Sequence, residues 1–364
     1  MTELIYSMCQ ASLNQLNTLQ KKSPKKQVKN AIKKVLGKNV MPDDPVFWPA
    51  GMLILGLSEA IITDHRQNEG ALSPYGQEIL SALEKYTSSW LEKYPASATR
   101  HVDDALAGYA FTRLYLETFV ETFKEGADRI ADFIINAKTD AAGSIIYHPE
   151  RGNSYIFADG SGMTALFLAK YGSAFHITKA LEASQIQLLN FQKYGFDRTS
   201  ALPYHGFDYD SKEKKGLVGW GRAIGWLMMG YSEVTTCSTD SKRNSLLEDY
   251  ISLTKTVISF QREDGSFSWQ PCCIEAHADT SATAMIAYSL KLFVTNLTDK
   301  SEIDQDTMTA IAASIDTARE YILSQVKDGV ATNSLGECID FSMHPQKYGT
   351  YPWGQGAALA LLSL

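Results

Sequence analysis

The sequence of 364 residues has little proline and glycine and no long hydrophobic run. With 11 prolines and 25 glycines, it lacks the composition of collagen-like and low-complexity chains. No window of about 18 uncharged apolar residues occurs, so we expect no membrane-spanning helix. The first twenty residues carry Glu3 and no continuous apolar stretch, which argues against a cleavable signal. We therefore expect a globular protein with no membrane partner.

Cysteine is also scarce, and its spacing suits neither disulfides nor zinc. The five cysteines are an odd number, Cys272 and Cys273 are adjacent, and no Cys-x-x-Cys pair occurs. Adjacent cysteines are poorly placed to bridge each other, and their distance from His277 does not fit a tetrahedral site. The pattern predicts reduced thiols, a cytoplasmic location and no metal.

Excess positive charge is absent as well. The net charge of −7 argues against a nucleic-acid partner. One segment differs, because residues 21–38 hold eight lysines and no acid, with apolar residues on one helical face. A patch for an anionic polymer is one interpretation. An outer helix with a solvated lysine face is the one that we favour.

The feature that organises the chain is a weak internal repeat. Six apolar, helix-forming runs each open on a small residue, and neighbouring runs start 54 to 75 residues apart. They cover residues 51–57, 108–116, 162–169, 225–231, 281–288 and 356–362. Because they are apolar most of the way round, we expect them to be buried helices.

Amphipathic stretches lie between the apolar runs, for example at 81–86, 128–135, 246–253 and 316–323. Six buried helices wrapped by six amphipathic ones predict an all-α fold, an (α/α)6 toroid forming a single domain over residues 1–364. An open helical solenoid is the alternative, and we favour closure because the sixth run ends the chain without a polar capping repeat. The short strand-like segments 144–148 and 265–269 are predicted to be loop hairpins.

The segments that precede the six runs carry unusual side chains. If the six helices run in the same direction, these side chains gather at one mouth of the toroid, where helix N-termini favour an anion. Simple helix capping is the alternative interpretation. The candidate residues are Trp48, His101, Asp103, Asp104, Asp159, Trp220, Arg222, His277 and Trp353.

Two acidic positions suit general acid–base work. Asp159 is either an N-cap or a carboxyl whose desolvation beside Tyr155 and Phe157 raises its pKa. Asp103 and Asp104 are adjacent at a helix start and point to different sides, so at most one is expected to face the pocket. Two carboxyl groups across a cleft suit glycoside chemistry.

A loop and the following helix start supply the other candidates. His205 is flanked by turn residues and aromatics such as Tyr204, so we place it in a loop, as either a catalytic or a structurally satisfied histidine. Trp220 and Trp226 offer faces to a sugar ring or pack in the core. Arg222 grips a substrate carboxylate or forms an ordinary salt bridge.

Four blocks in order resemble glycoside hydrolase families 88 and 105, the unsaturated glucuronyl and unsaturated rhamnogalacturonyl hydrolases. They begin His-Val-Asp-Asp-Ala-Leu-Ala-Gly at 101–108 and Phe-Ala-Asp-Gly-Ser-Gly-Met at 157–163. Tyr-His-Gly-Phe-Asp at 204–208 and Gly-Trp-Gly-Arg-Ala-Ile-Gly-Trp at 219–226 follow. Similar C-terminal blocks are Asp-Thr-Ser-Ala-Thr-Ala at 279–284 and Trp-Gly-Gln-Gly at 353–356.

The resemblance implies removal of a 4,5-unsaturated uronic acid from lyase-generated oligosaccharides by hydration of its vinyl-ether double bond, without cofactor or metal. Asp159 would protonate C4 and then activate water for addition at C5. His205 and Asp103 would orient substrate and water, Arg222 would hold the uronate, and Trp220 would stack on the sugar. Further substrate contacts expected are Trp48, His101, Asp104, Tyr204, His277 and Trp353.

The sequence departs from the family pattern at Ala223 and Ile224, where Gly and then Asn or Gln are more usual, so an amide expected at the mouth is absent. Two alternatives stay open at this point. One is a sugar epimerase or other (α/α)6 carbohydrate enzyme, with His101, His205 or His277 as acid and base. The other is a non-catalytic carbohydrate-binding protein on a degenerate toroid.

Overall fold

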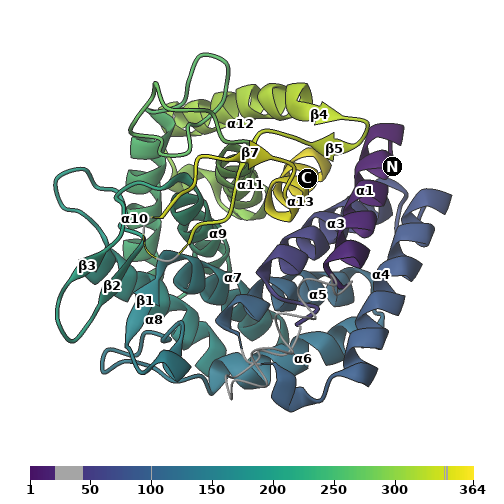
Figure 1. Cartoon of the computed structure of the whole chain (residues 1–364), viewed down its shortest axis with the longest axis horizontal. Coiled ribbons are helices and arrows are strands. Elements are labelled where there is room, and N and C mark those ends of the chain that lie inside the picture. The colour runs from purple at the N-terminus through teal and green to yellow at the C-terminus, as the bar shows by residue number, and fades with distance from the viewer. Residues whose placement is uncertain (21–43, 100, 340, 342) are drawn as a thin grey trace.

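The computed structural model describes residues 1–20, 44–99, 101–339, 341 and 343–364. In these residues twelve α-helices form an inner and an outer ring, and short strands lie in the connecting loops (Figure 1). The lysine-rich segment 21–38 lies outside the described residues, so its interpretation stays a prediction.

The inner ring holds the six apolar runs. Its helices are α3 (Trp48–Gln67), α5 (Ala105–Thr118), α7 (Ala158–Phe175), α9 (Gly221–Cys237), α11 (Thr280–Asn296) and α13 (Pro352–Ser363). Each packs against the next, and α13 packs against α3, which closes the ring (Figure 1). The predicted (α/α)6 toroid is therefore confirmed, and the open solenoid is excluded.

The outer ring consists of amphipathic helices that bury one face each. They are α1 (Glu3–Gln20), α4 (Pro74–Lys93), α6 (Glu121–Ile135), α8 (Thr178–Gly195), α10 (Ser241–Ile258) and α12 (Gln305–Gln325). In α6, for example, Phe123, Ile130 and Ile134 are buried at helical spacing while the charged residues face outward. The polar positions between the apolar runs thus mark the outer surface.

Small residues at the start of the apolar runs allow the inner helices to touch. A Cβ atom at Gly162 in α7 would collide with the carbonyl group of Trp226 in α9. A Cβ atom at Gly356 in α13 would collide with the carbonyl group of Met52 in α3. Because neither backbone can yield without moving a whole helix, these two glycines fix the close approach that closes the ring.

A polar network crosses the interior of the barrel below the helix starts. Arg113 of α5 donates to Glu59 of α3 and, at 3.2 Å, to the hydroxyl of Tyr288 in the opposite helix α11. Tyr109 of α5 donates to Glu233 of α9 at 2.8 Å, and Glu233 also pairs with Lys170 of α7 at 2.9 Å. Five inner helices are thereby linked by side chains that are buried inside the barrel.

Three small antiparallel sheets sit in the loops. The first joins β1 (Tyr155–Phe157), β2 (Gly206–Asp208) and β3 (Lys214–Lys215); β4 (Val326–Lys327) pairs with β5 (Val330–Ala331), and β6 (Ser334–Leu335) with β7 (Tyr348–Gly349). Short 3-10 helices are η1 (Ala96–Ala98), η2 (Val102–Asp104), η3 (Pro149–Arg151) and η4 (Lys300–Glu302). The segments predicted as hairpins at 144–148 and 265–269 form only isolated bridges, Thr139 with Ile145 and Ser268 with Ala278.

Two expectations from composition can be compared with the structure. Within the described residues, no helix combines the length and the apolarity needed to cross a bilayer. None of the five cysteines forms a disulfide bond, in agreement with the odd number and the unsuitable spacing.

Candidate active site

The starts of the six inner helices meet at one end of the barrel. The ring of Trp48 at the start of α3 lies 4.9 Å from that of Trp353 at the start of α13. The ring of His101 before α5 lies 5.3 Å from Phe47. The guanidinium group of Arg222 in α9 lies against the rings of both Trp220 and Trp353. The candidate residues therefore do gather around a single mouth.

Asp159 and His205 form the central contact of this mouth. Strand β1 runs directly into α7 and pairs with β2, and the backbone N–H of Ala158 donates to the carbonyl of His205 at 2.9 Å. This pairing places His205 Nε2 3.1 Å from Asp159 Oδ2. Asp159 lies in the first turn of α7 rather than at its N-cap position, which Phe157 occupies, so the capping interpretation is wrong for this residue.

The two carboxyl-bearing neighbours in η2 have different surroundings. Asp103 lies near Asp159 and is hydrogen-bonded to the Tyr147 hydroxyl. Burial, together with the negative charges of Asp159 and Asp44, raises the pKa of Asp103 to about 7. Asp104 is fully buried, and neither of its carboxyl oxygens has a hydrogen-bond partner among the described residues. Burial, together with the nearby Asp44 and Asp103, raises its pKa well above the usual value. Asp104 was expected to contact substrate, and its burial shows that this expectation is wrong.

Arg222 supports the site from beneath rather than facing a ligand. It is 1% exposed. Its Nη1 donates to the carbonyl of Leu335 at 2.9 Å, and its Nη2 donates to the carbonyl of Gly336 at 2.8 Å. Asp279, which caps α11 through the N–H of Ser281, lies 3.9 Å away. Arg222 is thus buried with both terminal nitrogens donating to main-chain carbonyls, contrary to the expectation that it faces a substrate carboxylate.

Trp220 likewise packs behind the wall of the mouth instead of facing it. It is 2% exposed and is covered by the rings of His205 and His344, at 4.6 and 4.8 Å, and by Arg222. The expectation that a sugar stacks on Trp220 is therefore not met, because other side chains occupy its faces. Trp226 and Ile224 are buried in the core, so the departure from the family pattern at Ile224 leaves the mouth unaffected.

The remaining candidates surround the mouth. Trp48, His101 and Tyr204 are half-buried, and Trp353 is buried and donates from Nε1 to the carbonyl of Leu335 at 2.9 Å. His277 is exposed, and its ring stacks on that of Tyr348 at 3.8 Å. These residues form an aromatic rim, the kind of surface on which sugar rings pack.

Sequence reasoning missed three residues of the mouth: Tyr147, Phe341 and His344. Phe341 stacks on Phe157 at 4.2 Å. His344 contacts the rings of Trp220 and Trp269. Burial and the nearby His205 and Arg222 lower the pKa of His344 to about 4. All three lie in loops that fold back over helix starts far away in the chain, so no local pattern marks them.

Among the described residues, no group of three or more His, Cys, Asp or Glu side chains is arranged to hold a metal ion. The mouth brings together two carboxyl groups, Asp103 and Asp159, and the imidazole of His205. Such a pair suits proton transfer to and from a bound sugar.

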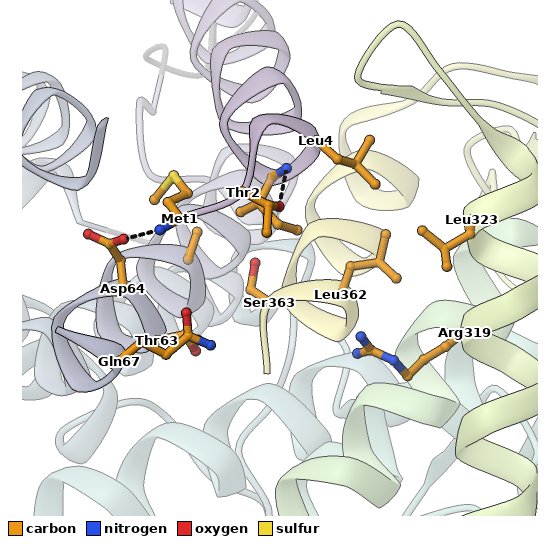
Figure 2. Close-up of a pocket in the computed structure, with 12 residues that line it drawn as sticks. Met1, Thr2, Leu4, Thr63, Asp64, Gln67, Arg319, Leu323, Leu362 and Ser363 are labelled. Carbon is orange, nitrogen blue, oxygen red and sulfur yellow. Dashed lines mark hydrogen bonds and ion pairs between the residues drawn. The ribbon is translucent and has the colours of Figure 1, made fainter. Parts of the chain in front are cut away.

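A cavity of about 240 Å³ lies at the other end of the barrel, between α1 and the C-terminal turns of α3 and α13 (Figure 2). Its carboxylate, Asp64, already accepts from the Met1 amino group and from Ser73. Arg319 on its wall donates to the carbonyl of Leu361 at 2.6 Å. This cavity lacks a pair of catalytic groups, so the mouth is the candidate active site.

The sequence model described as Glycosyl Hydrolase Family 88 matches residues 17–363. Among the curated proteins, none matches the sequence.

Solved structures share the fold at low identity. One is a possible member of the GH105 family from Klebsiella pneumoniae, with 17% identity, a TM-score of 0.77 and coverage of 100% of this chain and 93% of that one. Another is a family 105 glycoside hydrolase from C. acetobutylicum, with 18% identity, a TM-score of 0.71 and coverage of 94% and 99%. A third is the unsaturated glucuronyl hydrolase of Bacillus sp. GL1, with 19% identity, a TM-score of 0.65 and coverage of 89% and 88%.

Proposed function

Since the chain belongs to glycosyl hydrolase family 88, we propose that it removes a 4,5-unsaturated uronic acid from the non-reducing end of lyase-generated oligosaccharides. The observation that carries this proposal is the contact of Asp159 with His205 beside the buried Asp103. The proposal treats residues 1–364 as one catalytic domain acting in the cytoplasm, with an unsaturated uronyl oligosaccharide as its partner.

The reaction is the addition of water across the C4=C5 double bond. Asp159 donates a proton to C4, and the positive charge that develops at C5 is stabilised by the ring oxygen. The resulting Asp159 carboxylate accepts a proton from water as the water oxygen bonds to C5. The hemiketal at C5 then opens to a ketone, which leaves C1 as a hemiacetal. This hemiacetal collapses to an aldehyde, and its C1–O bond to the neighbouring sugar breaks, so that sugar leaves as a free alcohol. The proton balance of Asp159 is restored in each cycle, so no cofactor is consumed.

Asp103 and His205 influence where the protons lie around Asp159. Because the pKa of Asp103 is raised to about 7, this group is protonated below neutral pH and loses its proton around neutral pH. Asp103 and Asp159 together therefore keep the one proton that the reaction needs. His205, whose Nδ1 meets no hydrogen-bond partner among the described residues, is held by its packing against Phe157 and Trp220 and fixes the direction of the Asp159 carboxyl.

Substrate contacts come from the accessible rim. We assign the sugar-stacking role to Trp48, with His101, Tyr204 and His277 as polar contacts and Trp353 as the residue that fixes the orientation of Trp48. The N-termini of the six inner helices provide partial positive charge for the uronate carboxylate. Arg222 and Trp220 act through the hairpin and histidines that they support.

The test is to follow the ultraviolet absorbance of the conjugated double bond while the protein acts on a panel of lyase-generated unsaturated disaccharides. Loss of absorbance that disappears in Asp159→Asn would establish the hydration and rank the neighbouring sugars. A flat trace with every disaccharide, together with measurable binding of one of them, would instead favour the non-catalytic alternative.

A further inference from the structure

Tyr348 and His277 form a stacked pair on the rim of the mouth. Their ring centroids lie 3.8 Å apart, with 25° between the ring planes. His277 is exposed and precedes α11, whereas Tyr348 is half-buried and lies in β7. Because these two segments are far apart in the chain, other contacts must hold the pair together.

Asp279 is the side chain that joins the two segments. It is fully buried and follows His277 closely in the chain. Its Oδ1 accepts from the N–H and the hydroxyl of Ser281, at 2.9 and 2.7 Å, and from the N–H of Leu335 in β6 at 2.9 Å. Strand β6 pairs with β7, and Leu335 lies opposite Tyr348. One carboxylate thereby ties the start of α11 to the strand that is paired with the one carrying Tyr348.

Two further side chains hold the same strand. Arg222 Nη1 and Trp353 Nε1 both donate to the carbonyl of Leu335, each at 2.9 Å. Asp279 Oδ2 meets no hydrogen-bond partner among the described residues and lies 3.9 Å from Arg222 Nη1, so the guanidinium group offsets its buried negative charge. Because Asp279 is buried, it can act on a ligand only through the residues that it holds.

The start of α11 is the wall that faces the catalytic acids. In the ring of inner helices α11 lies opposite α5, and α7 is the next helix after α5 (Figure 1). Asp103 lies in η2, directly before α5, and Asp159 lies in the first turn of α7. The Tyr348–His277 pair therefore lies on the side of the mouth across from Asp103.

The pair presents an aromatic ring and a polar atom. His277 Nδ1 lies 2.8 Å from the carbonyl of Ala278, and a carbonyl only accepts, so Nδ1 carries the hydrogen. In the neutral imidazole Nε2 is then an acceptor, which suits a sugar hydroxyl. The hydroxyl of Tyr348 donates to Gln346 at 2.8 Å, so the ring is the part of Tyr348 that is suited to a sugar.

We propose that the Tyr348–His277 pair binds the saturated sugar next to the unsaturated uronate, and that Asp279 is the positioning residue that holds the pair together. The proposal rests on the proposed function, because the reaction at Asp159 defines which sugar is the second one. It adds Tyr348 to the substrate contacts and assigns His277 to the sugar that leaves.

The test compares two substrates that differ only in the group attached to the unsaturated uronate. One is an unsaturated disaccharide, and the other is the methyl glycoside of the same uronate. Tyr348→Ala should raise KM for the disaccharide about two- to tenfold, the range for a lost aromatic contact, with little change in kcat. KM for the methyl glycoside should stay at its native value.

Tyr75→Ala is the matched control. Tyr75 is also a stacked tyrosine, 4.0 Å from Tyr6, but it lies on the outer helix α4, so its loss should change neither KM. An unchanged KM for the disaccharide in Tyr348→Ala would overturn the assignment of Tyr348. So would an equal rise with both substrates, because it would place this residue against the uronate.

Asp279→Ala should reproduce the pattern of Tyr348→Ala, because the N–H of Leu335 loses its acceptor and β7 moves away from His277. Asp279→Asn keeps an acceptor oxygen and should retain most of the native affinity. Adding Tyr348→Ala to Asp279→Ala should have little further effect, since both changes remove the same contact. Circular dichroism establishes that each variant folds. Additive effects would show that Asp279 does not act through the pair.

A second readout needs neither turnover nor a change at Asp279. The imidazole ¹H NMR signal of His277, identified by its absence in His277→Gln, should move when an unsaturated disaccharide binds and stay in place with the methyl glycoside. A signal that stays in place at saturating disaccharide would overturn the proposal, as would an equal movement with both compounds. If the signal moves but no disaccharide is turned over, the proposed function fails while the sugar-binding position stands.

Discussion

Nε2 of His205 lies 3.1 Å from Oδ2 of Asp159, although 46 positions separate the two residues in the chain. The antiparallel pairing of Phe157 with Gly206 produces this contact. A strand of three residues thus aligns a loop histidine with a carboxyl in the first turn of a buried helix, and 16% of the Asp159 side chain remains exposed to the mouth.

Replacing Asp159 by Asn should lower turnover of an unsaturated disaccharide by about 10² to 10⁴-fold, the range for a lost general acid–base group. The amide can neither donate the proton to C4 nor accept one from water. Asp210→Asn, an exposed change of the same chemistry on the neighbouring loop, serves as the control and should keep native turnover. Near-native turnover in Asp159→Asn would remove this residue from the mechanism.

Asp103 should make stability depend on pH. Its pKa in the folded protein is about 7, against an ordinary value of 3.8, so the folded state binds the proton more tightly than the unfolded state. The stabilisation is fully present below about pH 4 and is lost as pH rises through about 7, by up to about 4 kcal/mol.

Asp103→Asn should consequently raise the unfolding temperature at pH 8 and change it little at pH 4, while it lowers turnover at both. Thermal unfolding followed by circular dichroism at the two pH values checks this. An equal effect of the substitution at both pH values would mean that Asp103 is not a buried acid with a raised pKa.

Arg222→Lys distinguishes support from direct binding. Lysine cannot make the two parallel bonds to the carbonyls of Leu335 and Gly336. We expect a loss of about 2–3 kcal/mol in unfolding free energy, as for hydrogen bonds to a charged group, together with a raised KM because the hairpin carrying His344 loosens. Arg66→Lys, on the surface beside Glu117, is the control. A raised KM with unchanged stability would show instead that Arg222 contacts the substrate.

Single substitutions in the polar network inside the barrel should strongly lower the free energy of unfolding. Arg113→Met leaves the buried Glu59 without its cation, and we expect a loss of about 3–5 kcal/mol in unfolding free energy. The double variant Glu59→Gln/Arg113→Met removes both charges and should recover part of that loss. Denaturation by urea measures both. A double variant less stable than the single one would show that the network is not held by the charge pair.

The fold could be predicted because its signal is repeated six times. Small residues that open apolar runs mark the places where inner helices touch, as Gly162 and Gly356 do. Because inner and outer helices alternate along the chain, all six inner helices start at the same end of the barrel. The prediction therefore placed Asp159, Asp103 and His205 together at one mouth.

The partners of individual side chains could not be predicted in the same way. Arg222 binds carbonyls 113 and 114 positions further along the chain, in a segment without periodicity. Trp220 is covered by His344 from the same segment. A helix-start position predicts that a residue is near the mouth, but the loops decide whether it faces the ligand or supports the wall.

The network that links α5 to α11 across the barrel also bears on the order of events in a catalytic cycle. Because buried side chains occupy the interior there, we expect a sugar that enters the mouth to leave by the same route. On the proposed function the unsaturated end is bound deepest, so it leaves only after the shortened oligosaccharide has departed. On that function, each encounter removes the single unsaturated unit and leaves a saturated end, so the shortened oligosaccharide is a product and does not bind again as a substrate.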